Sequence, residues 1–365
     1  MSRKTYRTVL IDYGDVKSLN WSSAAKAGGL GRIIPQDRTP ILTSVVLLRS
    51  ILRMAPVDAV CLRYLNDYPQ WPKTVVRLFS ELCTVLLCKV FRIQLLWICH
   101  NVDRETAQYF PRVSSLRRRV IARFADRIFV TDELLKKLAA QILQVPSEKI
   151  CVISFGMPFP KHPHAGRDEG GGCIGRILAW SSAYRKEFPR AKLGFWIGEV
   201  SPKKIGGLKE IQRIIVEAEK IGENVAFVIV GDIQNALNSA SQGLLEFFQS
   251  SRNVLFLPYA IDVPPLIWGQ FADFVWKPLD DLSVPMTAYN ACTSRLPICV
   301  LPGTFLAEFV EYHRIGLAFD GDSVISLIEE LDGLDDAAFE AFLADRSWAN
   351  GAYALLNSDR NTCSK

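Results

Sequence analysis

The sequence has few histidines and no paired cysteine motif. Only four of its 365 residues are histidine, and these are too scattered to suggest a metal cluster. None of the nine cysteines forms a Cys-x-x-Cys pair, and most stand inside apolar runs. We therefore expect buried, reduced thiols in a cytosolic protein, without disulfides or a metal site.

The sequence also lacks an uninterrupted apolar stretch long enough to cross a membrane. Its most apolar segment, residues 75–99, is interrupted by charged residues, which favours a buried helix followed by a strand. Residues 1–14 do not resemble a signal peptide but lead directly into a strand-like run. We predict a soluble or peripheral protein in the cytoplasm.

Charge is distributed unevenly along the chain. Residues 1–160 contain 24 Lys and Arg against 12 Asp and Glu, a balance of +12, whereas residues 161–365 contain 19 against 26, a balance of −7. This asymmetry predicts that the first half meets something anionic: a membrane surface, a lipid pyrophosphate or nucleic acid. The basic run at residues 114–119 is equally explained as a solvated helix face. Nucleic acid is not the expected partner, because the basic residues lack interleaved aromatic side chains.

Apolar runs of strand length alternate with helical patterns in both halves. The expected strands are 7–12, 58–63, 94–99, 127–131, 149–154, 192–198, 225–231, 254–258, 273–277 and 297–301. The expected helices are 41–54, 73–90, 114–124, 132–143, 207–221, 242–250, 283–294, 305–313 and 323–333. Because these strands are apolar on both faces and separated by helices, we predict parallel sheets covered on both sides.

Glycine, proline and charge without periodicity mark a linker between the two halves. The sequence therefore predicts an α/β chain of two doubly wound, Rossmann-like domains facing a central cleft. The expected parts are a first domain (1–160), a linker (161–175), a second domain (176–334) and a C-terminal helix (335–365) that packs back towards the first domain.

A polar cluster follows the third expected strand, at residues 97–105. His100 has the chemistry to hydrogen-bond a substrate hydroxyl, and Asp103 or Glu105 to remove a proton from an incoming alcohol. The alternative is a capping turn, in which Asn101 or Asp103 starts the next helix.

A glycine-rich segment follows the first strand and a long expected loop. Gly28, Gly29 and Gly31, between Lys26 and Arg32, form a candidate diphosphate loop, although they match neither a GxGxxG nor a Walker pattern.

The second half offers cations at successive strand-to-helix junctions. Lys203 and Lys204 precede one expected helix, and an ordinary solvated turn is the alternative there. Lys277 and Asp281 precede another, where Ser283 is expected to cap the helix and Pro285 to lie in its first turn.

These features resemble the GT-B glycosyltransferases over nearly the whole chain. The resemblance lies in Cys99-His100-Asn101, the strand end at 153–156, the segment 197–204 and the block 277–320. It implies that the second domain binds a nucleotide-sugar donor and the first an acceptor. Lys203 and Lys204 would then meet the diphosphate, residues from Ser283 to Met286 the nucleotide or its phosphates, and Glu308 the nucleotide.

The chain departs from the retaining members of that group, which have two glutamates eight residues apart. The matching positions here are Leu282 and Asn290. The segment 283–299 looks more like the inverting β-1,4-mannosyltransferases that extend lipid-linked chitobiose.

The sequence therefore predicts an inverting glycosyltransferase, with mannose as one candidate sugar and a lipid-linked or saccharide acceptor, in polysaccharide or glycoconjugate biosynthesis. Asp103 is the expected base, followed by Glu105 and Asp15. The nucleotide-sugar is a substrate, and no cofactor or obligatory metal is expected, because cations and helix dipoles stabilise the leaving diphosphate. The basic first half would face the cytoplasmic membrane surface. The alternatives are a catalytically degenerate GT-B protein that accompanies another transferase, and a sugar-nucleotide epimerase.

Overall fold

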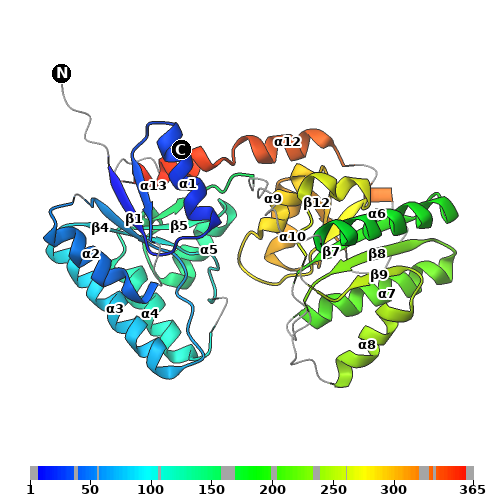
Figure 1. Ribbon diagram of the computed structural model, residues 1–365, viewed down its shortest axis with the longest axis horizontal. Coiled ribbons are helices and arrows are strands. Elements are labelled where there is room, and N and C mark those ends of the chain that lie inside the picture. Colours follow the sequence, from blue (N-terminus) through cyan, green and yellow to red (C-terminus); the bar gives the residue numbers. More distant parts are fainter. Residues whose placement is uncertain are drawn as a thin grey trace. The chain divides into compact units, whose positions relative to one another are not determined.

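The computed structural model describes residues 7–36, 40–55, 57–105, 108–157, 169–198, 204–232, 239–259, 261–319, 329–331 and 334–358 (Figure 1). The chain divides into two compact units. The first comprises Met1–Met157, Leu282–Val284 and Asp345–Lys365, and the second comprises Pro158–Asp281 and Pro285–Ala344. None of the described helices is long and apolar enough to cross a membrane.

The first unit is built on six parallel strands in the order β2-β1-β3-β4-β5-β6. The strands are β1 (Thr8–Ile11), β2 (Arg32–Pro35), β3 (Ala59–Leu62), β4 (Gln94–Ile98), β5 (Arg127–Val130) and β6 (Ile150–Val152). The helices are α1 (Val16–Ala27), α2 (Thr43–Leu52), α3 (Trp71–Val90), α4 (Pro111–Phe124), α5 (Leu134–Leu143) and α13 (Trp348–Leu356). Every residue of β1 and β3 is buried, as the apolar runs predict for a sheet covered on both faces.

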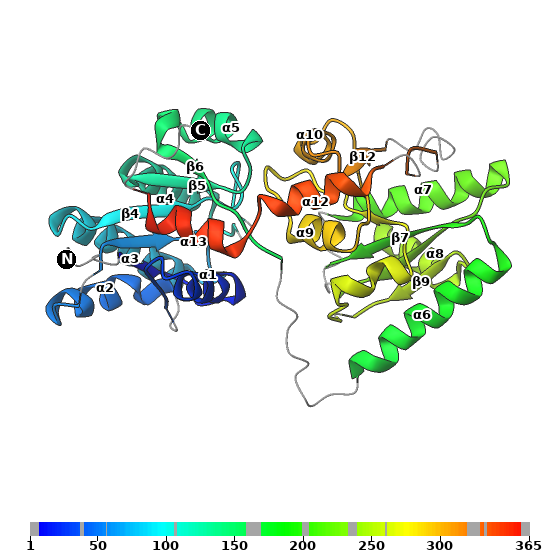
Figure 2. The ribbon, with the colours of Figure 1, turned by 90° about the horizontal axis from the view of Figure 1, so that it is seen from above.

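The helices of the first unit form two layers. Helices α2, α3, α4 and α5 contact one another in series, and α1 contacts α13 (Figures 1 and 2). Right-handed crossovers account for this division, because the chain leaves β1 in one direction through α1 and returns in the other through α2 and α3. Helix α1 alone would cover little of its face, so α13 completes the layer.

The second unit repeats the architecture, with strand order β12-β11-β10-β7-β8-β9 and all pairs parallel. Its strands are β7 (Lys192–Ile197), β8 (Val225–Val230), β9 (Val254–Leu257), β10 (Phe274–Trp276), β11 (Ile298–Val300) and β12 (Gly316–Ala318). Its α-helices are α6 (Glu169–Glu187), α7 (Ile205–Ile221), α8 (Ser239–Ser250), α9 (Met286–Thr293), α10 (Phe305–Tyr312) and α12 (Asp336–Ala344). The sequence thus correctly predicts two parallel, doubly wound sheets.

Two short strands and one helix depart from the prediction. Residues 16–27 form α1 where a long loop is expected, because Ser18 and Asn20 are buried beside Trp21 and obscure the apolar period. Strands β2 and β12 lie at sheet edges and have only four and three residues, too few for a clear pattern.

The predicted linker and C-terminal helix also differ from the structure. Helix α6 begins at Glu169 despite its glycines, because Trp180, Tyr184 and Phe188 pack with the second sheet. The expected helix at 335–358 is broken between α12 and α13, where Ser347 caps α13. Most of the expected helix at 323–333, and residues 161–168 of the expected linker, lie outside the described residues.

The cysteines are mostly free thiols, with one correction. Cys151 in β6 is disulfide-bonded, a proximity that sequence spacing did not reveal. Seven other described cysteines are free, and burial raises the pKa of Cys99 to about 12. Among the described residues no group of His, Cys, Asp and Glu is arranged to hold a metal ion.

Helix α13 approaches the first unit closely through Gly351. A Cβ atom at this position would lie 2.2 Å from the Ser154 carbonyl oxygen and 2.3 Å from Trp21 Nε1. The indole N–H of Trp21 itself donates to that carbonyl at 3.2 Å. No side chain larger than hydrogen fits without moving the helix.

We predict that Gly351→Ala lowers the free energy of unfolding by about 1–3 kcal/mol, because the added methyl group overpacks this contact. Gly175→Ala in α6 is the matched control, because a Cβ there meets nothing within 4 Å. That control should be neutral or stabilise by up to about 1 kcal/mol, as Ala replaces Gly within a helix. Thermal or urea unfolding of both variants checks the prediction, and equal stability of the two would contradict it.

Candidate functional site

In each sheet the chain first adds strands on one side of a starting strand and then on the other side, which creates a switch point. In the first unit β1 lies between β2 and β3, and in the second unit β7 lies between β8 and β10. Ligands of doubly wound proteins bind outside the carboxyl ends of the strands at such switch points. The residues that follow β1 and β3, and those that follow β7 and β10, are therefore the first candidates for a site.

In the first unit the switch point is occupied by an ion pair. Arg63 follows β3 and is almost fully buried, and its Nη1 lies 2.5 Å from Oδ1 of Asp15. Asp15 also caps α1 by accepting the Ser18 amide at 2.9 Å. The Arg63 guanidinium and the Ser18 amide help to hold the pKa of Asp15 below its usual value against the opposing effect of burial, which is the largest single influence. Asp15 is thus an ionised capping residue whose carboxylate is already engaged.

His100 follows β4 and lies within an aromatic stack. Its ring is 4.3 Å from that of Tyr64 and 5.8 Å from that of Phe155, nearly parallel to both. Burial, then the charges of Lys17 and Arg63, lower the pKa of His100 well below 6.5, so the imidazole is neutral at pH 7. Its Nε2 faces Arg63 Nη2 at 3.5 Å. Because guanidinium only donates, this arrangement favours the tautomer with its proton on Nδ1.

Lys17 adds a second cation to the same place. Its ammonium lies 4.6 Å from the centre of the Phe155 ring. Burial and Arg63 lower the pKa of Lys17 to about 8, while Asp15 opposes them. The first unit therefore presents Lys17, an Arg63–Asp15 ion pair and a neutral imidazole at its switch point, an arrangement suited to an anionic group with neighbouring hydroxyls.

The two carboxylates predicted as bases after β4 have different surroundings. Asp103 is exposed and lies 3.5 Å from Arg104. Glu105 is buried, pairs with Arg118 and accepts the Leu65 amide at 3.2 Å. Burial raises the pKa of Glu105, although Arg118 opposes this. Glu105 thus anchors the loop, whereas Asp103 is accessible.

The basic run at residues 114–119 is only partly a solvated face. Arg118 also donates to the carbonyl of Val102 at 2.6 Å, which fixes the loop that contains Asp103. Arg117 is buried between Glu81 at 2.6 Å and Asp67 at 2.7 Å. Arg117 and Arg118 are therefore neutralised inside the unit, and Arg119 is exposed.

The candidate diphosphate loop lies at the amino ends of the strands of the first sheet, whereas the switch-point residues follow the carboxyl ends. Gly28 caps the C-terminus of α1, and Gly29 has a φ of 57° in the turn that enters β2. Gly31 passes so close to the Arg7 carbonyl oxygen that a Cβ would lie 2.7 Å from it. These glycines serve a helix end and a tight approach where the strands begin, and the diphosphate loop stays a prediction.

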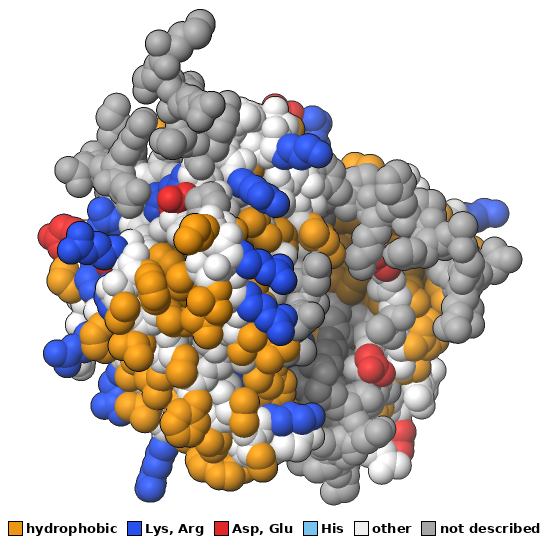
Figure 3. All heavy atoms as spheres, turned by 60° about the vertical axis from the view of Figure 1, so that its left-hand side comes forward, with side chains coloured by type: hydrophobic (Ala, Val, Ile, Leu, Met, Phe, Trp, Pro, Cys, Tyr) orange, Lys and Arg blue, Asp and Glu red, His pale blue; other side chains and the backbone are white. Residues whose placement is uncertain are grey.

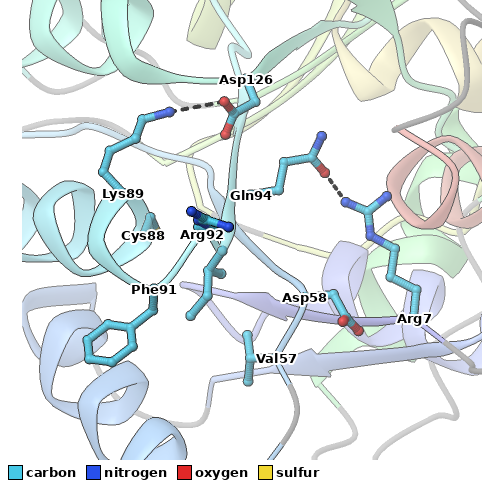
Figure 4. A pocket seen from close by; sticks show the side chains of 10 residues that line it. Arg7, Val57, Asp58, Cys88, Lys89, Phe91, Arg92, Gln94 and Asp126 are labelled. Carbon is cyan, nitrogen blue, oxygen red and sulfur yellow. Dashed lines mark hydrogen bonds and ion pairs between the residues drawn. The ribbon is translucent and has the colours of Figure 1, made fainter.

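A polar cavity of about 720 Å³ also lies at the amino ends of these strands (Figure 4). Its carboxylates are engaged with the backbone: Asp58 accepts the Thr8 amide at 2.7 Å and Asp126 the Leu95 amide at 2.8 Å. Lys89 also pairs with Asp126 at 3.0 Å. These contacts tie strand beginnings together, which is a structural role.

In the second unit two lysines flank the switch point. Lys204 stands at the N-terminus of α7 after β7, and Lys277 follows β10. Burial, then the charge of Lys204, lower the pKa of Lys277 to about 8, while Asp281 raises it. Lys203, the other predicted diphosphate residue, lies outside the described part of the chain.

Close packing fixes α7 against the segment that contains Lys277. Trp276 Nε1 donates to the Gly207 carbonyl at 3.0 Å. A Cβ on Gly207 would lie 2.0 Å from Pro278 Cγ, so only glycine permits this approach. The helix N-terminus with Lys204 is thereby held beside Lys277.

Helix α9 begins three residues after the start of the expected helix 283–294. Its N-cap is Pro285, without a side-chain cap, and Met286 is the first helical residue. Ser283 does not cap the helix and falls in the segment Leu282–Val284 that clusters with the first unit. In the first turn of α9 the Ala288 amide donates to the Pro285 carbonyl at 3.0 Å, and the positive end of the helix dipole favours an anion. By contrast, Thr304 caps α10.

Two further predicted donor residues have distinct environments. One turn into α9, the side-chain oxygen Oδ1 of Asn290 is buried without a hydrogen-bond partner among the described residues. Such an acceptor is suited to a ligand hydroxyl. Glu308 is exposed in the first turn of α10.

Sequence reasoning missed Arg63, Tyr64 and Lys17 and did not assign Asp12. Arg63 stands at the end of an expected strand, but nothing local indicates that this strand pairs with β1. Asp12 is buried at the end of β1, and its Oδ1 has no partner among the described residues.

Because Asp12 is buried, we expect the free energy of unfolding to depend on pH. Burial raises its pKa from 3.8 to about 7, against the charges of Arg77 and Arg63. The folded state therefore binds the proton more tightly than the unfolded state, and stability from this group falls as pH rises from about 4 to 7. Asp12→Asn, which mimics the protonated form, should raise the free energy of unfolding at pH 8 on the order of 2 kcal/mol, with little difference near pH 4.

Urea unfolding across this pH range checks the prediction. Glu246→Gln, at an exposed position on α8, is the control and should leave the pH dependence unchanged. An Asp12→Asn effect of equal size at both ends of the range would contradict it.

No protein-family model matches the sequence, and no curated protein matches it either. Solved structures do. WaaG, a glycosyltransferase involved in lipopolysaccharide biosynthesis, has a TM-score of 0.53 and 13% identity, covering 98% of this chain and 99% of its own. Anabaena HepE in complex with UDP-glucose has a TM-score of 0.51 and 13% identity, covering 96% and 94%. A proposed UDP-N-acetylglucosamine 2-epimerase from Listeria monocytogenes has a TM-score of 0.54 and 13% identity, covering 97% and 94%.

These similarities extend over almost the full length of each chain. At such identities they establish architecture, and they agree with the two doubly wound sheets described above. The chain has the GT-B fold.

Proposed function

We propose that this protein is a glycosyltransferase that moves a sugar from a nucleoside-diphosphate donor to a lipid-linked saccharide acceptor, with inversion, at the cytoplasmic face of a membrane. The observation that supports this proposal is the pair of lysines, Lys204 and Lys277, at the switch point of the second sheet. Two ammonium groups that disfavour each other's charge are stabilised by a dianionic diphosphate. Similarity to a UDP-glucose complex supports this choice of ligand.

The donor site would use residues from three elements. Lys204 and Lys277 neutralise the diphosphate, and the positive end of the α9 helix dipole favours it. Asn290 accepts a hydroxyl of the sugar or ribose through its buried Oδ1. Asp281 and Glu308 remain proposed contacts to donor hydroxyls. Charge that develops on the leaving diphosphate is thereby stabilised.

Acceptor activation would take place in the first unit. Asp103 is our choice of base because its ion pair with Arg104 is exposed to solvent. Glu105 pairs instead with buried Arg118, and Asp15 with buried Arg63. The base removes the proton of the acceptor hydroxyl, whose oxygen attacks the anomeric carbon as the bond to the diphosphate breaks. Neutral His100 orients a hydroxyl, and Lys17 with Arg63 suits an acceptor phosphate.

The local similarity of residues 283–299 to inverting mannosyltransferases makes mannose a candidate sugar. Asn290 stands where retaining enzymes have a glutamate, which supports inversion. An epimerase is the second candidate, because the Listeria protein is as similar in structure as WaaG. An epimerase would convert a free nucleotide sugar without an acceptor, so product analysis in the absence of lipid separates the two.

We predict that Lys277→Met weakens binding of the preferred nucleoside diphosphate by about 10- to 100-fold, because a charge-assisted contact is lost. Wild-type affinity should also fall as pH rises through about 8, where Lys277 loses its proton. Thermal shift with UDP, GDP, ADP and dTDP, followed by titration calorimetry, measures both. Lys209→Met, at an exposed position on α7, is the control. Unchanged affinity in Lys277→Met would remove this residue from the site.

We predict that Asp103→Asn reduces transfer by about 10²- to 10⁴-fold while nucleotide affinity is unchanged. Glu105→Gln should instead lower the melting temperature, because it weakens the Arg118 pair that anchors the loop. Nucleotide release from a panel of donor sugars in the presence of extracted lipid measures transfer. Full activity of Asp103→Asn would exclude it as the base, and no transfer by the wild type with any donor would favour the accompanying-protein alternative.

A further inference from the structure

Helix α3 is inverted relative to an ordinary surface helix. Its buried face is mainly polar and contains Thr74, Arg77, Ser80, Glu81 and Thr84. Its outward face is apolar: Val76, Phe79, Leu86 and Val90 are 53%, 61%, 62% and 63% exposed. A helix on the surface of a soluble domain shows the opposite pattern. These four residues follow one another at intervals of three, seven and four, which places them on one stripe.

Helix α2 extends this stripe into a continuous surface. Val45, Leu48 and Leu52 are exposed along one side of α2, which packs against α3. We call these three residues, with Val76, Phe79, Leu86 and Val90, the apolar face. Figure 3 shows hydrophobic side chains gathered on this side of the first unit, with Lys and Arg around them.

The orientation of α3 is fixed by the polar network beneath it. Arg77 Nε lies 3.0 Å from Glu81, and Glu81 lies 2.6 Å from Arg117, which also pairs with Asp67. Rotating the helix to bury Phe79 and its neighbours would break these buried pairs, which is strongly unfavourable. The apolar face is therefore a permanent feature of the surface.

The exposed charged side chains of helices α2 and α3 have one sign. Helices α2 and α3 contain a single acidic residue, the buried Glu81. The exposed charged side chains of these helices are Arg49, Lys73 and Lys89, followed by Arg53 and Arg92 directly after them. Lys89 pairs with Asp126 at 3.0 Å, and Asp58 lies farther along the chain after α2. In a twofold dimer through this face the same cations would face one another, which disfavours a second copy as the occupant.

We propose that the apolar face docks on an anionic lipid bilayer, with its hydrophobic side chains in the headgroup boundary and its basic rim against lipid phosphates. This inference rests on the membrane part of the proposed function and identifies the surface that makes the contact. It places α2 and α3 against the bilayer, so that an acceptor held by lipid lies close to the unit that activates it.

The test is co-sedimentation of the full chain with vesicles at low ionic strength. The wild type should bind mixed phosphatidylcholine–phosphatidylglycerol vesicles at least about tenfold more strongly than phosphatidylcholine alone, and added salt should weaken binding. The double variant Phe79→Asp/Leu86→Asp should bind the mixed vesicles at least about tenfold more weakly than the wild type. Leu266→Asp is the matched control, because Leu266 is 72% exposed on the second unit, and it should bind like the wild type.

Unfolding curves establish that the variants are folded, which is expected because both positions are exposed. Absence of wild-type binding, or equal binding by the double variant, would overturn the proposal. A self-association in sedimentation velocity that the double variant abolishes, without vesicle binding, would overturn it in favour of a protein interface. Nucleotide affinity of the same samples is measured in parallel, so that failure of membrane docking is distinguished from failure of the donor site.

Discussion

The repulsion between Lys204 and Lys277 is the constraint around which the proposed donor site is arranged. The loop after β10 and the N-terminus of α7 are held together by the Trp276–Gly207 hydrogen bond and the contact of Gly207 with Pro278. Burial disfavours the charge of Lys277, this packing places Lys204 beside it, and the pKa of Lys277 falls to about 8 as a result. A phosphate-bearing ligand reverses the penalty, since it stabilises both protonated forms. The free protein is thereby prepared for an anion.

The first unit uses charge differently at its own switch point. Arg63 is compensated by Asp15, and His100 is kept neutral between two cations and two aromatic rings. A second set of ion pairs, Arg117 with Glu81 and Arg118 with Glu105, positions α3, α4 and the loop that contains Asp103. One consequence of that network is the outward orientation of the apolar residues of α3. Site geometry and surface character in this unit therefore have a common cause.

The sequence predicted most of the strands and the parallel class of both sheets, because runs such as VAFVIV at 225–230 are apolar on both faces. It did not predict α1, whose buried side includes Ser18 and Asn20, or the short edge strands β2 and β12. These elements are specified by tertiary packing more than by local pattern.

The positions of His100 and Lys277 after strands β4 and β10 could be predicted from the sequence, because each follows an apolar run. Contacts that depend on the order of the strands could not be predicted from the sequence. Arg63 contacts Asp15 only because β3 lies beside β1. The glycines at 28–31 have a composition that suits a phosphate loop, but they lie where the strands begin. Asp103 and Glu105 are close in sequence, and their different roles follow from burial. Glu105 is buried against Arg118 and anchors the loop, whereas exposed Asp103 is the candidate base.

The most direct test of the central claim is proton uptake on nucleotide binding. Titration calorimetry of the preferred nucleoside diphosphate at about pH 8, in buffers of different ionisation enthalpy, measures the protons exchanged. The diphosphate is already fully ionised at this pH, so uptake reports the protein. We expect about half a proton to be taken up at this pH, as the bound anion raises the pKa of Lys277. Binding without proton uptake at about pH 8 would contradict a diphosphate site at Lys204 and Lys277.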